Sequence, residues 1–247
     1  MVNSGLDTRD TDRRLQGRAA TVRRTLSRDY VKRSACQHPW MGVLEVESPS
    51  GLARVYLSYA DAARAWLLLG HGAGGGVEAP DLVAASEAAL AERVSVGLVE
   101  QPYRVAGRRS PPRAPQLDAA WGAVVDRLRE RELSGLPLLV GGRSLGARVA
   151  CRTASATEAI AVLCLAFPLQ PPRRSGAAPA PSRIPELDAV AVPALVVQGT
   201  RDPFGMPPAD GQRVVVEVPG DHSLKADLPA VSAAVQSWLS ELLARRR

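Results

Sequence analysis

The chain has few aromatic residues and no long apolar segments, and both shortages exclude classes of protein. Phe, Trp and Tyr make up only 4% of its 247 residues, so a core must consist mainly of Leu, Val and Ala. No apolar stretch approaches the ~18 residues that a membrane-spanning helix needs, and the N-terminus lacks the apolar segment of a secretory signal. With 46% hydrophobic and 23% charged residues, the composition is typical of a soluble globular protein.

Cysteine and histidine are also scarce, with three of each. Cys36, Cys151 and Cys164 are an odd number without close spacing, which favours free thiols in a reducing, cytoplasmic setting over a disulfide framework. Cys151 and Cys164 fall in a predicted helix and strand, so we expect them to be buried as small apolar side chains. The sequence has no H-E-x-x-H pattern and no paired Cys/His spacing, and we expect neither a metal nor another cofactor.

Positive charge is concentrated at the N-terminus. Residues 1–40 contain nine Arg or Lys and four Asp, which leaves 22 basic and 21 acidic residues in the rest of the chain. A basic arm can bind nucleic acid or an anionic surface, but the nearly neutral body shows no nucleic-acid-binding module, so we do not favour nucleic acid as a partner. We interpret residues 1–40 as a disordered extension, or as sequence upstream of a true start at Met41, and residues 41–247 as one domain.

Strand and helix patterns alternate from Met41 onward. A hairpin is expected over residues 43–47 and 52–58, joined by the turn Pro49-Ser50-Gly51. Further strands are expected at 65–69, 94–99, 137–140, 159–165, 193–198 and 213–218, and helices at 80–93, 116–133, 145–157 and 230–244. The pattern predicts an α/β fold with a mostly parallel central sheet and helices on both faces. The loop over 168–185 is too short for a large cap domain.

The most informative motif is Gly142-Arg143-Ser144-Leu145-Gly146, between a predicted strand and a predicted helix. This G-x-S-x-G pattern is typical of a sharp turn that lifts a serine hydroxyl out of a sheet. The pentapeptide alone is weak evidence in a chain with 21 glycines. It predicts a nucleophile, and therefore an acid and a histidine further along the chain.

Both partners follow in that order. His38 lies outside the predicted body and His71 precedes the serine, which leaves His222, just after the last predicted strand. Asp202 directly follows the strand at 193–198, so it should emerge at the same sheet edge, where ligands bind in such folds. Asp221, next to His222, would point elsewhere. The alternatives without a catalytic role are that His222 is a solvated loop residue and that Asp202 belongs to a surface turn.

These residues predict acyl transfer. Ser144 Oγ would attack a carbonyl carbon, His222 would accept and return its proton, and Asp202 would orient and stabilise the imidazole. The backbone N–H of Leu145, at a helix N-terminus, would stabilise the oxyanion, together with that of Ala73 in the glycine-rich loop at 71–76.

Two other patterns compete for the same regions. Gly70, Gly72 and Gly75, with Glu100 after the next strand, resemble a dinucleotide-binding fingerprint, although no helix follows at once and the other three residues stay unexplained. Arginines also gather near the predicted mouth and would favour an anionic acyl substrate, or simply be solvated. They are Arg108, Arg109, Arg113, Arg143, Arg173 and Arg174.

Taken together, these motifs resemble the α/β-hydrolases, and within them the dienelactone-hydrolase-like branch. The nearest likeness is to a group related to the testis-expressed 30 protein and the non-specific-lethal complex subunit 3. The motifs are HGAGGG (71–76), GGRSLGAR (141–148), FPL (167–169), QGTRDPFG (198–205) and DHS (221–223). The resemblance spans Met41 to the C-terminus. It implies Ser144, Asp202 and His222 as the triad and a catalytic domain without a large cap.

The resemblance has one departure. The true dienelactone enzymes use a cysteine nucleophile where this chain has Ser144, so their substrate is not carried over. We expect a serine hydrolase that cleaves a small ester, thioester or lactone. Because the group includes subunits of complexes, a non-catalytic interaction protein on the same scaffold is the alternative.

Overall fold

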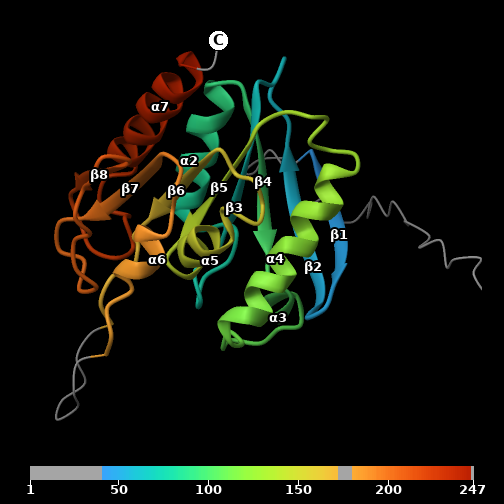
Figure 1. Cartoon of the computed structure of the whole chain (residues 1–247), viewed down its shortest axis with the longest axis horizontal. Coiled ribbons are helices and arrows are strands. Elements are labelled where there is room, and N and C mark those ends of the chain that lie inside the picture. Colours follow the sequence, from blue (N-terminus) through green and yellow to red (C-terminus); the bar gives the residue numbers. More distant parts are fainter. Residues whose placement is uncertain (1–40, 172–179, 246–247) are drawn as a thin grey trace, which may run out of the picture.

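A single mixed sheet organises the chain in a computed structural model that describes residues 41–171 and 180–245 (Figure 1). Its eight strands lie in the order β1-β2-β4-β3-β5-β6-β7-β8. The pairs β1–β2 and β2–β4 are antiparallel, and every later pair is parallel. This is the α/β-hydrolase fold with the antiparallel N-terminal hairpin that the sequence predicts. Cys36 and His38 lie outside the described residues.

The elements alternate along the chain as expected. The strands are β1 (Gly42–Ser48), β2 (Gly51–Ser58), β3 (Ala65–Gly70), β4 (Val94–Glu100), β5 (Leu138–Arg143), β6 (Ala161–Leu165), β7 (Ala194–Gly199) and β8 (Arg213–Val218). The helices are α2 (Pro80–Ala91), α3 (Pro102–Val105), α4 (Ala114–Arg129), α5 (Leu145–Thr153), α6 (Ile184–Asp188) and α7 (Leu228–Ala244).

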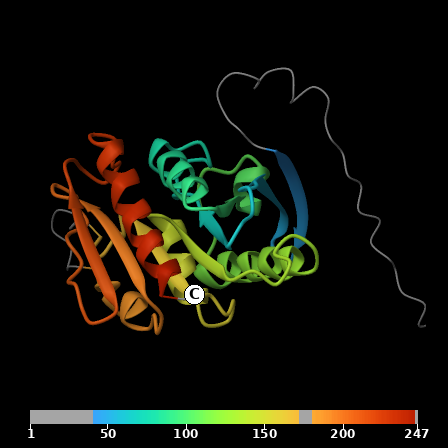
Figure 2. The ribbon, with the colours of Figure 1, turned by 90° about the horizontal axis from the view of Figure 1, so that it is seen from above.

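The parallel strands are buried on both faces, which explains their short, uninterrupted apolar runs. In β3, Leu68 packs into a cluster with Trp121 of α4 and Val149 of α5. Its neighbour Leu67 points to the other face, into a cluster that includes residues of α2 and α7 such as Leu82. Figure 2 shows α2 and α4 on opposite sides of the sheet. The sheet is therefore the middle layer of three.

Some boundaries differ from the sequence expectation for local reasons. Helix α7 begins at Leu228 rather than near residue 230, because the Asp227 side chain caps it by accepting a hydrogen bond of 2.9 Å from the N–H of Ala230. The short helices α3 and α6 lie in segments expected to be loops. Each has a proline in its first turn and a buried residue, Tyr103 in α3 and Leu187 in α6.

No segment of residues 41–171 and 180–245 forms a cap domain over the sheet. Among the helices in these ranges, none is both long and apolar enough to cross a membrane.

Candidate active site

Ser144 occupies the sharp turn between β5 and α5. Its backbone has φ 54° and ψ −104°, a conformation that costs energy for a residue with a side chain. The Ser144 N–H donates to the carbonyl of Leu165 at the end of the neighbouring strand β6, at 2.9 Å. The strained backbone raises the side chain above the carboxyl edge of the sheet, as in a nucleophile elbow.

The two glycines of the motif are required by the close approach of β3. A Cβ added at Gly146 would lie 2.1 Å from the carbonyl oxygen of Gly70, and one at Gly142 would lie 2.4 Å from the same atom. Neither position can accept a side chain unless the backbone moves. The turn is thus packed directly against the strand that leads into the glycine-rich loop.

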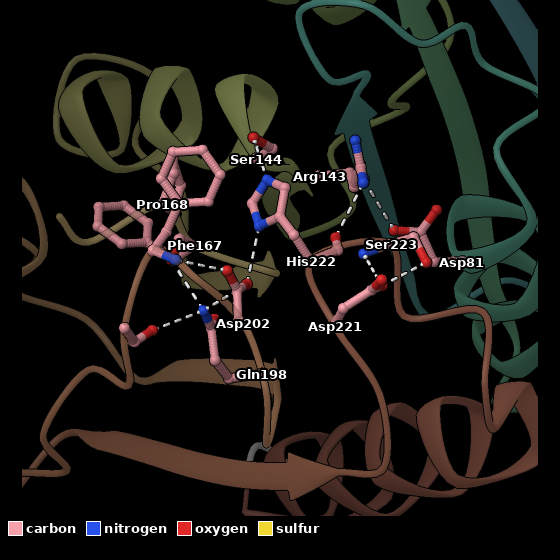
Figure 3. A network of polar contacts seen from close by, with 12 residues as sticks. Asp81, Arg143, Ser144, Phe167, Pro168, Gln198, Asp202, Asp221, His222 and Ser223 are labelled. Carbon is pink, nitrogen blue, oxygen red and sulfur yellow. Dashed lines mark hydrogen bonds and ion pairs between the residues drawn. The ribbon is translucent and has the colours of Figure 1, made fainter. Parts of the chain in front are cut away.

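Three side chains from distant parts of the sequence form a hydrogen-bonded chain (Figure 3). His222 Nε2 lies 2.9 Å from Ser144 Oγ, and His222 Nδ1 lies 2.8 Å from Asp202 Oδ2. Because a carboxylate only accepts, Nδ1 carries the proton and Nε2 is free to accept from the serine hydroxyl. The side chain of Asp202 is fully buried, whereas that of His222 is 18% exposed. The arrangement can move a proton between the serine and the imidazole.

The loops that carry Asp202 and His222 are joined through their backbones. The N–H of Arg201 donates to the carbonyl of Gly220 at 2.8 Å. At the end of β7, a Cβ added at Gly199 would lie 2.5 Å from the carbonyl oxygen of Asp221, so the two loops are in contact. The Asp221 side chain accepts from the N–H and hydroxyl of Ser223 and does not contact the imidazole.

Two further residues surround the Asp202–His222 contact. Gln198 of β7 is buried, and its Nε2 donates to Asp202 Oδ2 at 2.8 Å. The Phe204 N–H donates to the other carboxylate oxygen at 2.9 Å, and its ring lies 4.4 Å from that of His222, centroid to centroid. Neither Gln198 nor Phe204 was predicted from the sequence as a site residue. A lone amide side chain in an otherwise apolar strand was the available signal for Gln198.

The glycine-rich loop after β3 is anchored by two buried side chains. The Tyr103 hydroxyl donates to the carbonyl of Ala73 at 2.9 Å, and burial raises the pKa of Tyr103 to about 12, which keeps this donor protonated. The N–H groups of Ala73 and Leu145 donate to no other residue in the described ranges. Both donors remain available to an oxyanion, the role the sequence predicts for them.

His71 is the second buried group and contributes to the loop rather than to the triad. The N–H of Gln101 donates to His71 Nε2 at 3.1 Å, so the ring proton is on Nδ1 and is donated to the carbonyl of Gly72 at 2.8 Å. Burial lowers the pKa of His71. The ring is therefore neutral. It connects the glycine-rich loop to the residue that follows β4.

A cavity of about 590 Å³ is lined in part by Arg143 and Ser223, which are next to Ser144 and His222 in the sequence. The side chains of the triad do not line it. Its basic lining residues are Arg104, Arg143 and Lys225, and its acidic ones are Glu78, Asp81 and Glu100. Of the arginines considered in the sequence analysis, only Arg143 lines this cavity. Arg108, Arg109 and Arg113 are exposed elsewhere, and Arg173 and Arg174 lie outside the described residues.

The two described cysteines are free and buried, as expected, and their Sγ atoms lie 3.5 Å apart in the core between α5 and β6. In the described ranges, no group of three or more His, Cys, Asp or Glu side chains is placed to hold a metal ion. The glycine-rich loop enters α2 only at Pro80, four residues after Gly76. A dinucleotide fingerprint would open directly into the helix.

The fold and the geometry of the site are those of the α/β-hydrolase class. The chain belongs to the α/β-hydrolase family, because residues 63–230 match the family described as Alpha/beta hydrolase domain. A search of curated proteins found no match.

Solved structures with a similar fold include three that cover most of this chain. One is an α/β serine hydrolase without a lid from Xanthomonas campestris, with 20% identity, a TM-score of 0.64, and coverage of 83% of this chain and 94% of that chain. Est1E from Butyrivibrio proteoclasticus has 16% identity, a TM-score of 0.66, and coverage of 82% and 99%. A dienelactone hydrolase from Anabaena variabilis has 16% identity, a TM-score of 0.60, and coverage of 82% and 96%. At these identities the likeness establishes the fold.

Proposed function

We propose that the protein is a serine hydrolase that cleaves a small ester, thioester or lactone through an acyl-enzyme intermediate. The observation that carries the proposal is the continuous contact from Ser144 Oγ through His222 to the buried carboxylate of Asp202. A hydroxyl, an imidazole and a carboxylate in this order are the groups that nucleophilic acyl transfer requires.

In the first half-reaction, Ser144 Oγ bonds to the carbonyl carbon of the substrate while its proton passes to His222 Nε2. The tetrahedral intermediate then collapses, its bond to the leaving oxygen or sulfur breaks, and His222 returns the proton to that atom. In the second half-reaction, water attacks the acyl carbon and gives a proton to His222. The bond from the acyl carbon to Ser144 Oγ then breaks, His222 returns the proton to Oγ, and the acid is released. Asp202 stabilises the imidazolium in both halves.

The negative charge of each tetrahedral intermediate needs hydrogen-bond donors. We assign this role to the N–H groups of Leu145 and Ala73, both free of partners in the described residues. The Leu145 N–H stands at the N-terminus of α5, where the helix dipole also favours an anion. Removal of one such donor typically costs roughly 3–4 kcal/mol of transition-state stabilisation.

The substrate class is supported by the similar structures. Est1E has been solved with ferulic acid bound, and another relative is a dienelactone hydrolase. Both descriptions concern carboxylic acids or their cyclic esters. Within the family, we place the chain in the dienelactone-hydrolase-like branch, near the group of the testis-expressed 30 protein. The mechanism uses only groups of the protein chain and water, and we propose that it acts in the cytoplasm without a cofactor.

A fluorophosphonate probe tests this proposal, because it phosphonylates an activated serine and releases fluoride. We expect stoichiometric labelling of the full chain at Ser144 and turnover of short-chain p-nitrophenyl esters. Ser144→Ala should abolish both while its thermal unfolding stays close to that of the wild type. A chain that begins at Met41 should be labelled at the same rate, since no described site residue precedes it. A folded protein that is neither labelled nor active would contradict hydrolysis and support a non-catalytic interaction protein.

A further inference from the structure

Arg143, the residue before the nucleophile, contacts two other segments of the site. Its Nη2 donates to the backbone carbonyl of His222 at 2.9 Å. Its Nε lies 3.3 Å from Asp81 Oδ2 in the first turn of α2. Gly72 also packs against its side chain, since a Cβ there would lie 2.8 Å from Arg143 Nη1. One guanidinium thus lies among the nucleophile turn, the histidine loop, α2 and the glycine-rich loop (Figure 3).

The contact with His222 has no substitute in the described residues. The main chain of His222 makes no other hydrogen bond there. The imidazole is bonded at both nitrogens, and the preceding carbonyls of Gly220 and Asp221 accept from the N–H groups of Arg201 and Leu224, but none of these bonds reaches the carbonyl of His222 itself. The bond from Arg143 Nη2 fixes the carbonyl of His222 relative to the residue adjacent to Ser144.

Asp81 in turn orients the guanidinium. Its carboxylate is only 1% exposed and lies within ion-pair distance of the Arg143 side chain, itself 18% exposed, although Asp81 Oδ2 and Arg143 Nε make no hydrogen bond among the described residues. Burial raises the pKa of Asp81, and the positive charge of Arg143 acts against that rise. A buried carboxylate beside a guanidinium restricts where the arginine can lie, because each charge is costly to bury without the other.

We propose that Arg143, oriented by Asp81, is a positioning residue that holds His222 over Ser144 in the hydrolysis proposed above. It does not need to touch the reacting atoms. Its effect is to keep Nε2 of the imidazole within hydrogen-bond distance of the serine hydroxyl. A displacement of about 1 Å between catalytic groups can cost ~100-fold in rate, so the loss should appear in kcat rather than in KM.

The test uses the double variant Arg143→Met/Asp81→Asn, which removes both charges and leaves no buried carboxylate unpaired. The matched control is Arg152→Met/Asp118→Asn, which removes an ion pair of 2.6 Å between α5 and α4, away from His222. We expect kcat to fall roughly 10- to 100-fold in the first variant with KM within about twofold, and to stay near wild type in the control. Arg143→Lys, with Asp81 retained, should recover part of the loss.

A second readout does not depend on activity. The Nδ1 proton of His222, donated to a buried carboxylate, should give a low-field proton resonance that exchanges slowly in the wild type. We expect the resonance to broaden or disappear in Arg143→Met/Asp81→Asn and to persist in the control, with circular dichroism unchanged in both. If the first variant keeps both the resonance and wild-type kcat, the inference is wrong. If the wild type proves inactive, the proposed function fails and the resonance alone decides the positioning role: its loss supports that role and its retention overturns it.

Discussion

Gln198 shows how much a single residue can determine at this site. Its Nε2 lies within 3.1 Å of three acceptors, Asp202 Oδ2 and the carbonyls of Phe167 and Gly205. Among the residues that the structure describes, no group forms a hydrogen bond with its buried Oε1. The amide therefore faces the carboxylate with its donor side, and the same carboxylate oxygen accepts from His222. Because Gln198 donates at this position, Asp202 Oδ2 acts as an acceptor for both Gln198 and His222.

We expect Gln198→Glu to lower kcat/KM by about a hundredfold at pH 7, the lower end of the range attributed to general acid–base catalysis. Two carboxyl groups at this distance cannot both remain charged, so they would share a proton and Asp202 would bind the imidazole less well. Gln198→Met, which is similar in size and uncharged, should lose much less. Ester hydrolysis by the two variants makes the comparison, and equal losses would refute the charge argument.

At the scale of elements, the contact between β3 and α5 sets the shape of the nucleophile turn. A side chain at residue 146 would collide with backbone rather than with a movable side chain, because its Cβ would lie 2.1 Å from the oxygen of Gly70. Gly122, a half-buried residue of α4, has nothing within 4 Å of its added Cβ. Both positions are glycine, but an added Cβ would meet backbone at residue 146 and open space at residue 122.

Gly146→Ala should therefore destabilise the protein by about 1–3 kcal/mol or more, the usual cost of overpacking. Gly122→Ala should stabilise it by about 0.5–1 kcal/mol, because alanine is the better helix former. Urea unfolding of both variants measures the difference. A Gly146→Ala protein as stable as the wild type would show that β3 and α5 can separate at little cost.

Elements were predictable from sequence where burial is complete. The strands from β3 to β7 read as short apolar runs because both faces of the sheet are covered. The helices α3 and α6 were missed, since four or five residues contain too few turns to show a periodic pattern. Their formation depends on burial of Tyr103 and Leu187, which is a tertiary effect.

At the scale of the whole molecule, the buried His71 makes the free energy of unfolding depend on pH. Burial lowers its pKa from the ordinary 6.5, so below that pH the unfolded chain binds a proton that the folded chain does not. Folding stability is fully present above pH 6.5 and falls as the pH drops below it, by at most about 1.4 kcal/mol per pH unit. The stability stops falling once the pH is below the pKa of His71 in the folded protein.

We expect His71→Gln to lose less stability than the wild type between pH 7 and pH 5, whatever its stability at pH 7. Other titrating groups, including Asp81 with its raised pKa, are common to both proteins and cancel in the comparison. Urea unfolding at several pH values provides the measurement. Parallel curves for the two proteins would show that His71 does not titrate as its burial implies.

The order of strands, helices and chemically active residues along this chain was sufficient to predict its fold class and to select Ser144, Asp202 and His222 as candidates. That information is local: apolar runs, a turn motif and the position of each residue after a strand. Contacts between segments decided the rest, including Gln198 beside Asp202, Arg143 between Asp81 and His222, and the cavity residues Arg104 and Lys225, which lie beside Arg143 where the sequence predicted Arg108, Arg109 and Arg113. Such contacts depend on how loops from different strands approach one another, and no periodicity in the sequence records those distances.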